Sequence, residues 1–144
     1  MEKIAVIGGG AAGMMASIFA ARRGMEVHVY EKNEKTGKKL YITGKGRCNL
    51  TNACDMEELL ESVKSNKKFL YSAFYGFTNQ DAYDFFEAEG LKLKVERGNR
   101  VFPLSDRSAD VLDTLRGAMR SAGVQVHLNT EVKSVRKQED GFTL

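Results

Sequence analysis

The chain has 144 residues, of which 42% are hydrophobic and 28% charged, and 22 basic against 19 acidic residues give a net charge of +3. This profile is that of a globular domain with one core, and it excludes a disordered or fibrous chain. So small a basic excess indicates no nucleic-acid partner, and no run reaches the ~18 apolar residues of a membrane span. With only Cys48 and Cys54 and no secretory signal pattern, we expect a cytoplasmic protein.

The first thirty residues predict a strand, a helix and a second strand. Ile4–Ile7 is a short apolar run, typical of a strand buried on both faces of a parallel sheet. Ala11–Arg23 is rich in apolar residues and is followed by Gly24, as in a buried helix with a glycine cap. Met25–Glu31 then alternates in the manner of a strand. Three such elements in this order predict a right-handed βαβ unit.

The middle of the chain predicts short helices and one hairpin. Lys32–Asn52 is polar and contains three glycines, so we expect a long loop. Helices are then predicted with caps at Asp55 and Thr78, and a further one between them, over Lys67–Phe77. Gly98-Asn99 predicts the turn of a hairpin. We interpret residues 40–103 as an insertion between the second strand and the next crossover helix.

The last forty residues return to the parallel pattern. A helix capped by Ser105 or Ser108 is predicted up to Gly123, and Val124–Leu128 follows as the third parallel strand. A hairpin is predicted around residues 139–141, and its second arm has only begun when the chain ends. This resembles the start of a β-meander, so we expect residues 1–144 to be the N-terminal part of a longer domain, as a truncated gene product or an expressed fragment.

A G-x-G-x-x-G motif begins at Gly8, between the first strand and its helix. Gly8 permits a tight turn, Gly10 leaves room for a pyrophosphate beside the backbone, and Gly13 lets the helix lie close to the strand. Ala11 and Ala12 begin the helix, where free amides and the helix dipole attract an anion. Strand, glycine loop and helix together predict a Rossmann-like α/β fold with a parallel sheet.

An acidic residue ends the second strand at the position that such a site requires. Glu31 lies 18 residues after Gly13 (31 − 13), near the ~20 expected for the carboxylate that binds a ribose. A 2′-phosphate would be repelled there, so the first nucleotide is not NADP. The alternative is a glycine-rich turn followed by a solvated acid at the strand end.

The segment after Glu31 favours FAD over NAD. NAD dehydrogenases pass quickly to a crossover helix, whereas this chain inserts about seventy residues before its third strand. Lys32, Lys38, Lys39 and Arg47 bring positive charge to glycine-rich backbone soon after the acid, as a long dinucleotide needs. A solvated basic loop is the alternative.

These motifs resemble a bacterial family of aminoacetone-oxidase-like FAD-binding flavoproteins, which includes a 3-dehydro-bile-acid reductase. The similarity covers essentially the whole chain but only about the first third of the family's length. The segments that carry it are Gly8–Gly13, Gly37–Leu40, Thr43–Asn52 and Arg100–Pro103.

The resemblance implies FAD as the cofactor and assigns residues to it. It implies that Ala12 and its glycine neighbours contact the pyrophosphate, and that Glu31 binds the adenosine ribose. The other implied cofactor contacts are Lys38 and Lys39 near the cofactor, Gly46, Arg47, Cys48 and Asn49 beside the flavin, and the backbone of Val132 at the adenine.

Three further groups of residues have a structural and a functional interpretation. Cys48 and Cys54 are separated by five residues rather than the four of flavin-coupled redox pairs, so two ordinary thiols are favoured over a disulfide reductase. His28 and His127 are interpreted as hydrogen-bonded sheet residues. The aromatic residues between 69 and 77 are either core or a wall on the substrate side, and we favour core; the neighbouring lysines are interpreted as a solvated face.

The sequence therefore predicts an FAD-dependent oxidoreductase in which the flavin transfers a hydride. We expect a small-molecule substrate, with NAD(P)H as a candidate reductant, and neither nucleic acid, membrane nor metal as a partner. No catalytic acid or base is identified. The alternatives are a non-catalytic nucleotide-binding fragment and an NAD-binding domain.

Overall fold

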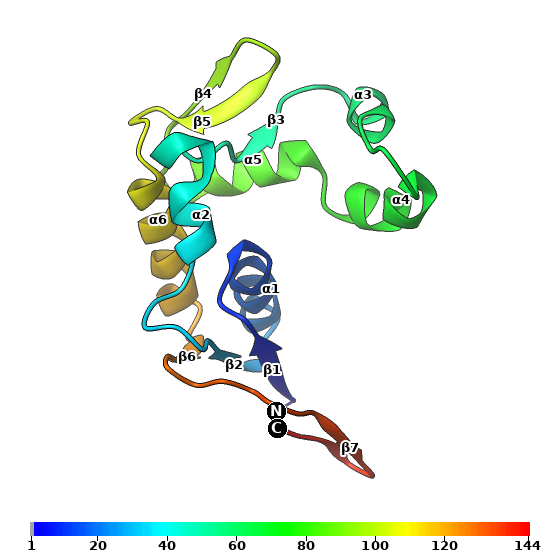
Figure 1. The fold of residues 1–144 in the computed structure, drawn as a ribbon, viewed down its shortest axis with the longest axis vertical. Helices are drawn as coiled ribbons and strands as arrows, with labels where there is room; N and C mark the ends of the chain where they lie inside the picture. Colours follow the sequence, from blue (N-terminus) through cyan, green and yellow to red (C-terminus); the bar gives the residue numbers. More distant parts are fainter. Residues whose placement is uncertain (1) are drawn as a thin grey trace. The chain divides into compact units, whose positions relative to one another are not determined.

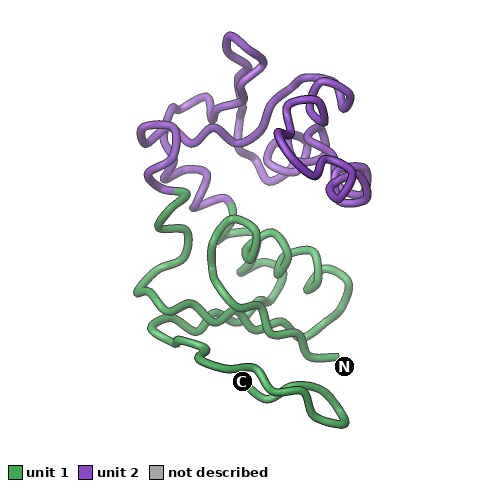
Figure 2. The backbone as a smooth tube through the Cα atoms, turned by 45° about the vertical axis from the view of Figure 1, so that its right-hand side comes forward, with its two compact units in different colours: residues 1–40, 115–144 green, residues 41–114 purple. Residues whose placement is uncertain are grey.

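The computed structural model describes residues 2–144, which form two compact units (Figure 2). The first unit contains the residues up to Leu40 together with Leu115–Leu144, and the second contains Tyr41–Thr114. The insertion expected at residues 40–103 stays a prediction about the domain organisation.

The first unit is built on a three-stranded parallel sheet with the order β1-β2-β6 (Figure 1). The strands are β1 (Lys3–Ile7), β2 (Glu26–Tyr30) and β6 (Gln125–His127). Helix α1 (Ala11–Arg22) connects β1 to β2, which lie in parallel register from Lys3 opposite Glu26 to Ile7 opposite Tyr30. The predicted βαβ unit, the third parallel strand and the Rossmann-like α/β class are confirmed.

The core of this unit lies between α1 and one face of the sheet. Met14 and Ile18 of α1 are fully buried, and Val27 and Val29 of β2 are at most 1% exposed. Gly13 lies where α1 approaches the end of β1: a Cβ atom built on it would lie 2.0 Å from the carbonyl oxygen of Gly8. Only glycine permits this approach, as the motif predicts.

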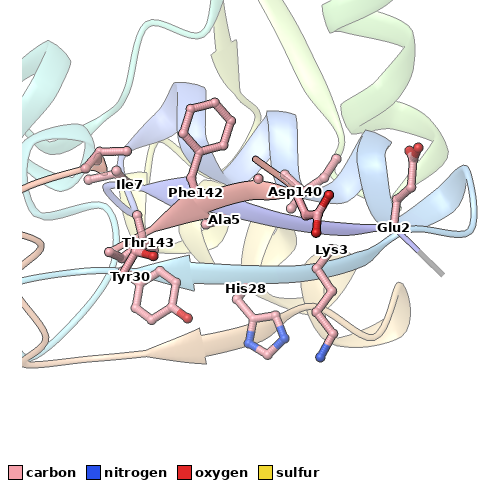
Figure 3. A pocket seen from close by; sticks show the side chains of 13 residues that line it. Glu2, Lys3, Ala5, Ile7, His28, Tyr30, Asp140, Phe142 and Thr143 are labelled. Carbon is pink, nitrogen blue, oxygen red and sulfur yellow. The ribbon is translucent and has the colours of Figure 1, made fainter. Parts of the chain in front are cut away.

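The opposite face of the sheet is open, so the expectation that β1 is buried on both faces is wrong. Ala5 and Ile7 are exposed, Ile7 over 53% of its surface. This face borders a hollow of about 1200 Å3, and the hairpin of β7 (Arg136–Gln138) and β8 (Gly141–Thr143) provides its other wall (Figure 3). An apolar strand is buried on both faces only where a second layer covers the sheet.

The two histidines lie on this open face and are hydrogen-bonded, as expected. Nδ1 of His28 lies 3.0 Å from Nε2 of His127, and Nε2 of His28 lies 3.0 Å from Oε1 of Glu26. The ring of Tyr30 stacks on that of His127, with centroids 4.8 Å apart. Lys3 completes the group with an ion pair of 3.2 Å to Glu26. The row of side chains joins β6, β2 and β1 across the sheet.

The second unit contains a small antiparallel sheet and several short helices. The sheet has the order β3-β5-β4, from β3 (Thr51–Asn52), β4 (Leu93–Glu96) and β5 (Arg100–Pro103), and β4 and β5 form the predicted hairpin. The helices that lie wholly or partly in this unit are α2 (Lys38–Ile42), the 3-10 helix η1 (Thr43–Gly46), α3 (Met56–Glu61), α4 (Lys67–Gly76), α5 (Asn79–Ala88) and α6 (Ser108–Ser121).

The expected long loop over 32–52 is wrong, because it contains α2, η1 and β3. Gly37, with φ of +73°, donates its N–H to the carbonyl of Gly9 at 2.8 Å, and Lys38 follows as the first residue of α2. Glycine and charge indicated a loop here, but a single left-handed glycine is enough to turn the chain into a helix.

Two of the three predicted helix starts carry their predicted caps. The Asp55 carboxylate accepts a bond of 2.8 Å from the Glu58 N–H, and Thr78 forms a capping box with Asp81. The third prediction is wrong, because α6 begins at Ser108 itself. The Ser108 hydroxyl donates to the Tyr41 carbonyl at 2.6 Å, so it ties the start of α6 to α2 instead of capping the helix.

The aromatic cluster in α4 is not core, contrary to the favoured interpretation. Phe69 is 85% exposed and Tyr75 63% exposed, and none of the residues of α4 is buried. The buried aromatic pair of this unit is instead Phe85 and Phe86 of α5, whose rings pack edge to face at 5.2 Å. No helix within residues 2–144 is long and apolar enough to cross a membrane.

Replacing Gly13 by alanine is predicted to destabilise the fold by about 1–3 kcal/mol, the usual cost of overpacking a closely packed site. The added methyl group collides with the Gly8 carbonyl, a backbone atom that cannot move aside alone. Chemical denaturation followed by circular dichroism measures the change. Gly10→Ala is the matched control, because a Cβ there has no neighbour within 4 Å. Equal stability of the two variants would contradict the packing argument.

Candidate dinucleotide site

The glycine loop leaves backbone amides free at the start of α1. Gly8, with φ of +99°, donates its N–H to the Tyr30 carbonyl at 2.8 Å and turns the chain away from β1. The first helical bond runs from the Met14 N–H to the Gly10 carbonyl at 2.9 Å. The amides of residues 11–13 thus have no acceptor within the helix. No side chain caps this end of α1 and its first turn holds no acid, so its positive end is left for an anion.

Gly9 and Gly10 have different roles in the loop. A Cβ on Gly10 would have no neighbour within 4 Å, so the space in front of this residue is open to a ligand. A Cβ on Gly9 would instead lie 2.7 Å from the methyl group of Thr36 and 3.2 Å from the Glu31 carboxylate. Gly9 therefore packs against the protein, while Gly10 faces the space that the motif predicts for a pyrophosphate.

Glu31 is 7% exposed and joins the glycine loop to the end of β2. Its Oε2 accepts the Gly9 N–H at 2.8 Å, and its Oε1 accepts both the backbone and the side-chain N–H groups of Asn33, at 2.8 and 2.7 Å. A carboxylate has about four acceptor positions, so three bonds leave Oε2 able to accept one more. The acid thus organises the loop before any sugar binds.

The same contacts determine the charge state of Glu31. Burial alone would raise the pKa of its carboxyl group, but the bonds from Asn33 and Gly9, and the nearby charge of Lys32, together lower the pKa below its ordinary value. Glu31 is consequently a carboxylate at neutral pH, as an acceptor of ribose hydroxyls must be.

A hollow of about 420 Å3 lies beside the loop and collects most of the predicted contacts of this unit. It borders the glycine loop, the end of β2, the segment that leads into α2, and residues 130–132. The predicted residues that line it are Gly8, Gly10, Glu31, Lys32, Lys38, Lys39 and Val132. Ala11 and Ala12 are exposed at the start of α1, and Gly13 lies behind them against Gly8. Lys38 and Lys39 are both exposed, and Lys38 forms an ion pair of 3.1 Å with Glu34.

The four other predicted contacts, Gly46–Asn49, belong to the second unit. The Arg47 side chain donates to the Asp106 carboxylate through Nε and Nη2, at 2.8 and 2.6 Å, and also bonds Glu96. The hydrogen bond to Glu96, and after it those to Asp106, raise the pKa of Arg47. Its guanidinium also lies 4.1 Å above the centre of the Phe102 ring. A cofactor contact through this side chain would share it with two carboxylates.

The loop around Arg47 has an unusual backbone. Gly44, Lys45, Gly46 and Cys48 all have positive φ angles, between 56° and 85°, although two of them carry side chains. The N–H groups of Arg47 and Cys48 donate to the carbonyls of Gly44 and Thr43. These amides are therefore already satisfied within the loop.

Cys48 and Asn49 are both held by the protein itself. Cys48 is 3% exposed, and burial raises the pKa of its thiol; Cys54 is also a free thiol. Oriented as its carbonyl neighbours require, the Asn49 amide donates to the carbonyls of Thr51 and Val101, at 3.1 and 3.2 Å. A buried thiol with a raised pKa is a weak nucleophile, so these contacts do not favour disulfide chemistry.

Sequence reasoning missed three residues that shape the site. Asn33 and Gly9 donate to Glu31, and Thr36, 5% exposed, packs on Gly9. Asn33 had a recognisable signal, because an asparagine two residues after a carboxylate at a strand end can bond it locally. The contacts of Gly9 and Thr36 depend on tertiary structure, so the sequence carries no local signal for them.

The larger hollow on the open sheet face offers a different chemistry. Its wall carries Ala5, Ile7, Tyr30 and Phe142, together with the charged Lys3 and Asp140 (Figure 3). It lacks the free helix amides that suit a diphosphate, so the smaller hollow is the better dinucleotide site. Within residues 2–144, no three His, Cys, Asp or Glu side chains are arranged to hold a metal ion.

Comparison with known proteins assigns this arrangement to a family. The HI0933-like protein Rossmann domain matches residues 2–144. The 3-dehydro-bile acid delta(4,6)-reductase of Clostridium scindens is 34% identical, over all of this chain and 35% of its own length. The ribosomal RNA dihydrouridine synthase of Escherichia coli is also 34% identical, over 96% of this chain and 34% of its length. The chain thus spans about a third of the length of these curated relatives.

Solved structures share the fold at low identity. The THI4 protein of Thermovibrio ammonificans aligns with a TM-score of 0.64 at 12% identity, over 98% of this chain and 44% of that one. The 3-ketosteroid-delta4-(5alpha)-dehydrogenase of Rhodococcus jostii RHA1 aligns with a TM-score of 0.57 at 15% identity, over 96% of this chain and 40% of that one. At these identities the likeness concerns the fold alone.

Glu31→Gln is predicted to lower the stability of the free protein in a pH-dependent manner. Because the folded state lowers the pKa of Glu31, its stabilising contribution is complete above the ordinary glutamate pKa of about 4.3. It is lost as the pH falls through the still lower pKa of the folded state. We therefore expect wild type to be the more stable at pH 7, and the gap to close in acid. A gap that is constant from pH 7 to pH 3 would show that the charge of Glu31 is irrelevant.

Proposed function

Because the chain belongs to the HI0933-like protein family, through its Rossmann domain, we propose that it is the dinucleotide-binding part of an FAD-dependent oxidoreductase. The observation that carries this proposal is the hollow beside the glycine loop, where unbonded helix amides, an ionised Glu31 and two lysines surround one space. These groups suit, in turn, a diphosphate, a ribose and the negative charge that a dinucleotide brings.

The residues of the first unit fit FAD. The amides at the start of α1, with the open space at Gly10, would hold the pyrophosphate, and the remaining acceptor position of Glu31 would bind the adenosine ribose. Val132 would lie at the adenine, and Lys38 and Lys39 along the phosphates. The flavin contacts implied for Gly46–Asn49 of the second unit are part of the proposal, although the side chains of Arg47 and Asn49 and the amides of Arg47 and Cys48 already bond protein partners. A bound flavin supplies the hydride chemistry.

The two curated relatives suggest the class of reaction. One is named for a delta(4,6)-reductase acting on a 3-dehydro-bile acid, and the other makes dihydrouridine. In both cases the chemistry saturates a carbon–carbon double bond conjugated to a carbonyl group. We propose the same class for the protein to which this chain contributes: a hydride adds to the carbon β to the carbonyl, and a proton adds to the α carbon.

NAD(P)H is the proposed source of electrons, because reduction of each substrate oxidises the flavin by two electrons. In this proposal FAD occupies the hollow beside the glycine loop, so NAD(P)H would act from outside it; the carboxylate of Glu31 also argues against the 2′-phosphate of NADPH in that hollow. A cytoplasmic setting is also a proposal, and rests on the two free thiols.

Gly10→Val is predicted to abolish FAD binding while the protein stays folded. Gly10 has extended backbone, with φ of −78°, and open space around its Cα, so valine fits the fold but fills the place of the phosphate. Titration with FAD, followed by flavin fluorescence and the visible spectrum, measures the affinity, and circular dichroism verifies the fold.

Gly10→Ala is the graded control, with a smaller loss expected. NADH titrated under the same conditions separates an FAD site from an NAD site. Retained FAD affinity in Gly10→Val would remove the pyrophosphate from this loop, and tighter binding of NADH than of FAD would overturn the choice of cofactor.

The reaction class is tested with the FAD-loaded chain after chemical reduction under anaerobic conditions. We expect a 4-en-3-one steroid or uridine in RNA to reoxidise the flavin, and their saturated counterparts to leave it reduced. The chain spans about a third of the length of its curated relatives. If it binds FAD but neither compound reoxidises the flavin, FAD binding stands as the function of this chain and the reaction class is not supported for it.

A further inference from the structure

Helix α4 exposes several large aromatic side chains to solvent, and they contribute little to the core of the second unit. Phe69 is 85% exposed, Tyr75 63% and Tyr71 39%. Lys68 is exposed in the same helix, and Lys64 in the segment before it. We call these five residues the α4 aromatic face. Scattered exposed aromatics are ordinary, but several on one short helix mark an interaction site.

Three of the five residues share a side of α4 because of helical periodicity. Lys68, Tyr71 and Tyr75 are spaced by three and four residues, so they lie along one side of α4. Phe69 lies about 100° further round the helix, and Lys64 lies in the segment before it. Leu70 and Phe74 are half-buried on the other side, and α4 packs against α3. Leu70 and Phe74 therefore pack against the rest of the unit, and the residues of the α4 aromatic face do not.

Positive charge accompanies the aromatic rings. Between Ser62 and Gln80 the chain has three lysines and no carboxylate. Lys67 is neutralised by Glu61, but Lys64 and Lys68 form no ion pair among residues 2–144. Two free cations thus lie beside three exposed rings.

We propose that the α4 aromatic face binds single-stranded RNA. Exposed tyrosine and phenylalanine rings stack on unpaired bases, and lysines contact the phosphates between them. The inference deepens the proposed function, since it assumes that the unsaturated carbonyl to be reduced is a uracil base within RNA. The expectation of no nucleic-acid partner followed from the small overall charge of +3 and from acids interleaved with the basic residues, and the stretch from Ser62 to Gln80 departs from that balance.

The shape of the face favours RNA over the other candidates. A steroid binds in an enclosing pocket, and α4 is a convex helix with its rings in solvent. A membrane surface would need a continuous apolar side, whereas tyrosine hydroxyls and Ser72 interrupt this one. A duplex offers phosphates but no unstacked bases for the rings to contact.

Binding of a fluorescein-labelled oligouridylate to the full 144-residue chain, followed by fluorescence anisotropy, tests the proposal. Phe69→Ala and Tyr75→Ala are each expected to weaken binding by about five- to 150-fold, the range for one base–aromatic stack. Lys64→Gln and Lys68→Gln are expected to weaken it less and to reduce its dependence on salt. All four residues are exposed, so the variants should fold, as circular dichroism would verify.

Matched controls come from the β7–β8 hairpin of the first unit. Phe142→Ala removes a ring that is 70% exposed, and Lys137→Gln removes an exposed lysine, so both should leave RNA affinity unchanged. Equal weakening by the controls, or binding too weak to detect at low salt, overturns the proposal. So does self-association of the chain that Phe69→Ala abolishes without any RNA binding, because the face would then be an interface between copies.

Gly10→Val separates this inference from the proposed function. If Gly10→Val loses FAD binding but binds RNA as wild type does, the RNA surface is independent of the cofactor site. FAD binding by wild type without RNA binding refutes the surface and leaves the flavin assignment standing.

Discussion

Helix α1 approaches the end of strand β1 at a distance that only a hydrogen atom on Gly13 permits. This approach places the start of the helix directly against the turn at Gly8, so that the unbonded amides face one small space instead of diverging into solvent. The absence of a capping side chain or an acid in the first turn preserves their charge. The anion site therefore exists because of a steric contact behind it.

Glu31 extends that constraint to the rest of the site. Its carboxylate is a structural group as well as a candidate ligand, because it already accepts the Gly9 N–H and both donors of Asn33. The loop is thus held in shape without a nucleotide, and binding need not supply the entropy of ordering it. The second unit follows the same pattern, since Arg47 fixes its own loop through Asp106 and Glu96.

The sequence was informative where structure is local. The βαβ order, the caps at Asp55 and Thr78 and the glycine loop each depend on residues within a few positions of one another, and each is present. It was misleading where burial depends on another element that packs on the strand or helix from elsewhere in the chain. Burial of Ile7 requires a layer over the sheet, and burial of Phe69 requires a partner for α4, and neither requirement is visible in periodicity. The roles predicted for individual cofactor contacts stay predictions.

The pair of histidines on the open sheet face has a consequence for how strands β2 and β6 are joined. A carboxylate carries no proton, so Nε2 of His28 donates to Glu26, which leaves Nδ1 to accept the Nε2 proton of His127. The hydrogen bonds therefore run in one direction, from His127 of β6 through His28 to Glu26 of β2. Because each ring nitrogen that takes part has a fixed role, the outer strand β6 is linked to the middle strand by side chains as well as by its short backbone ladder.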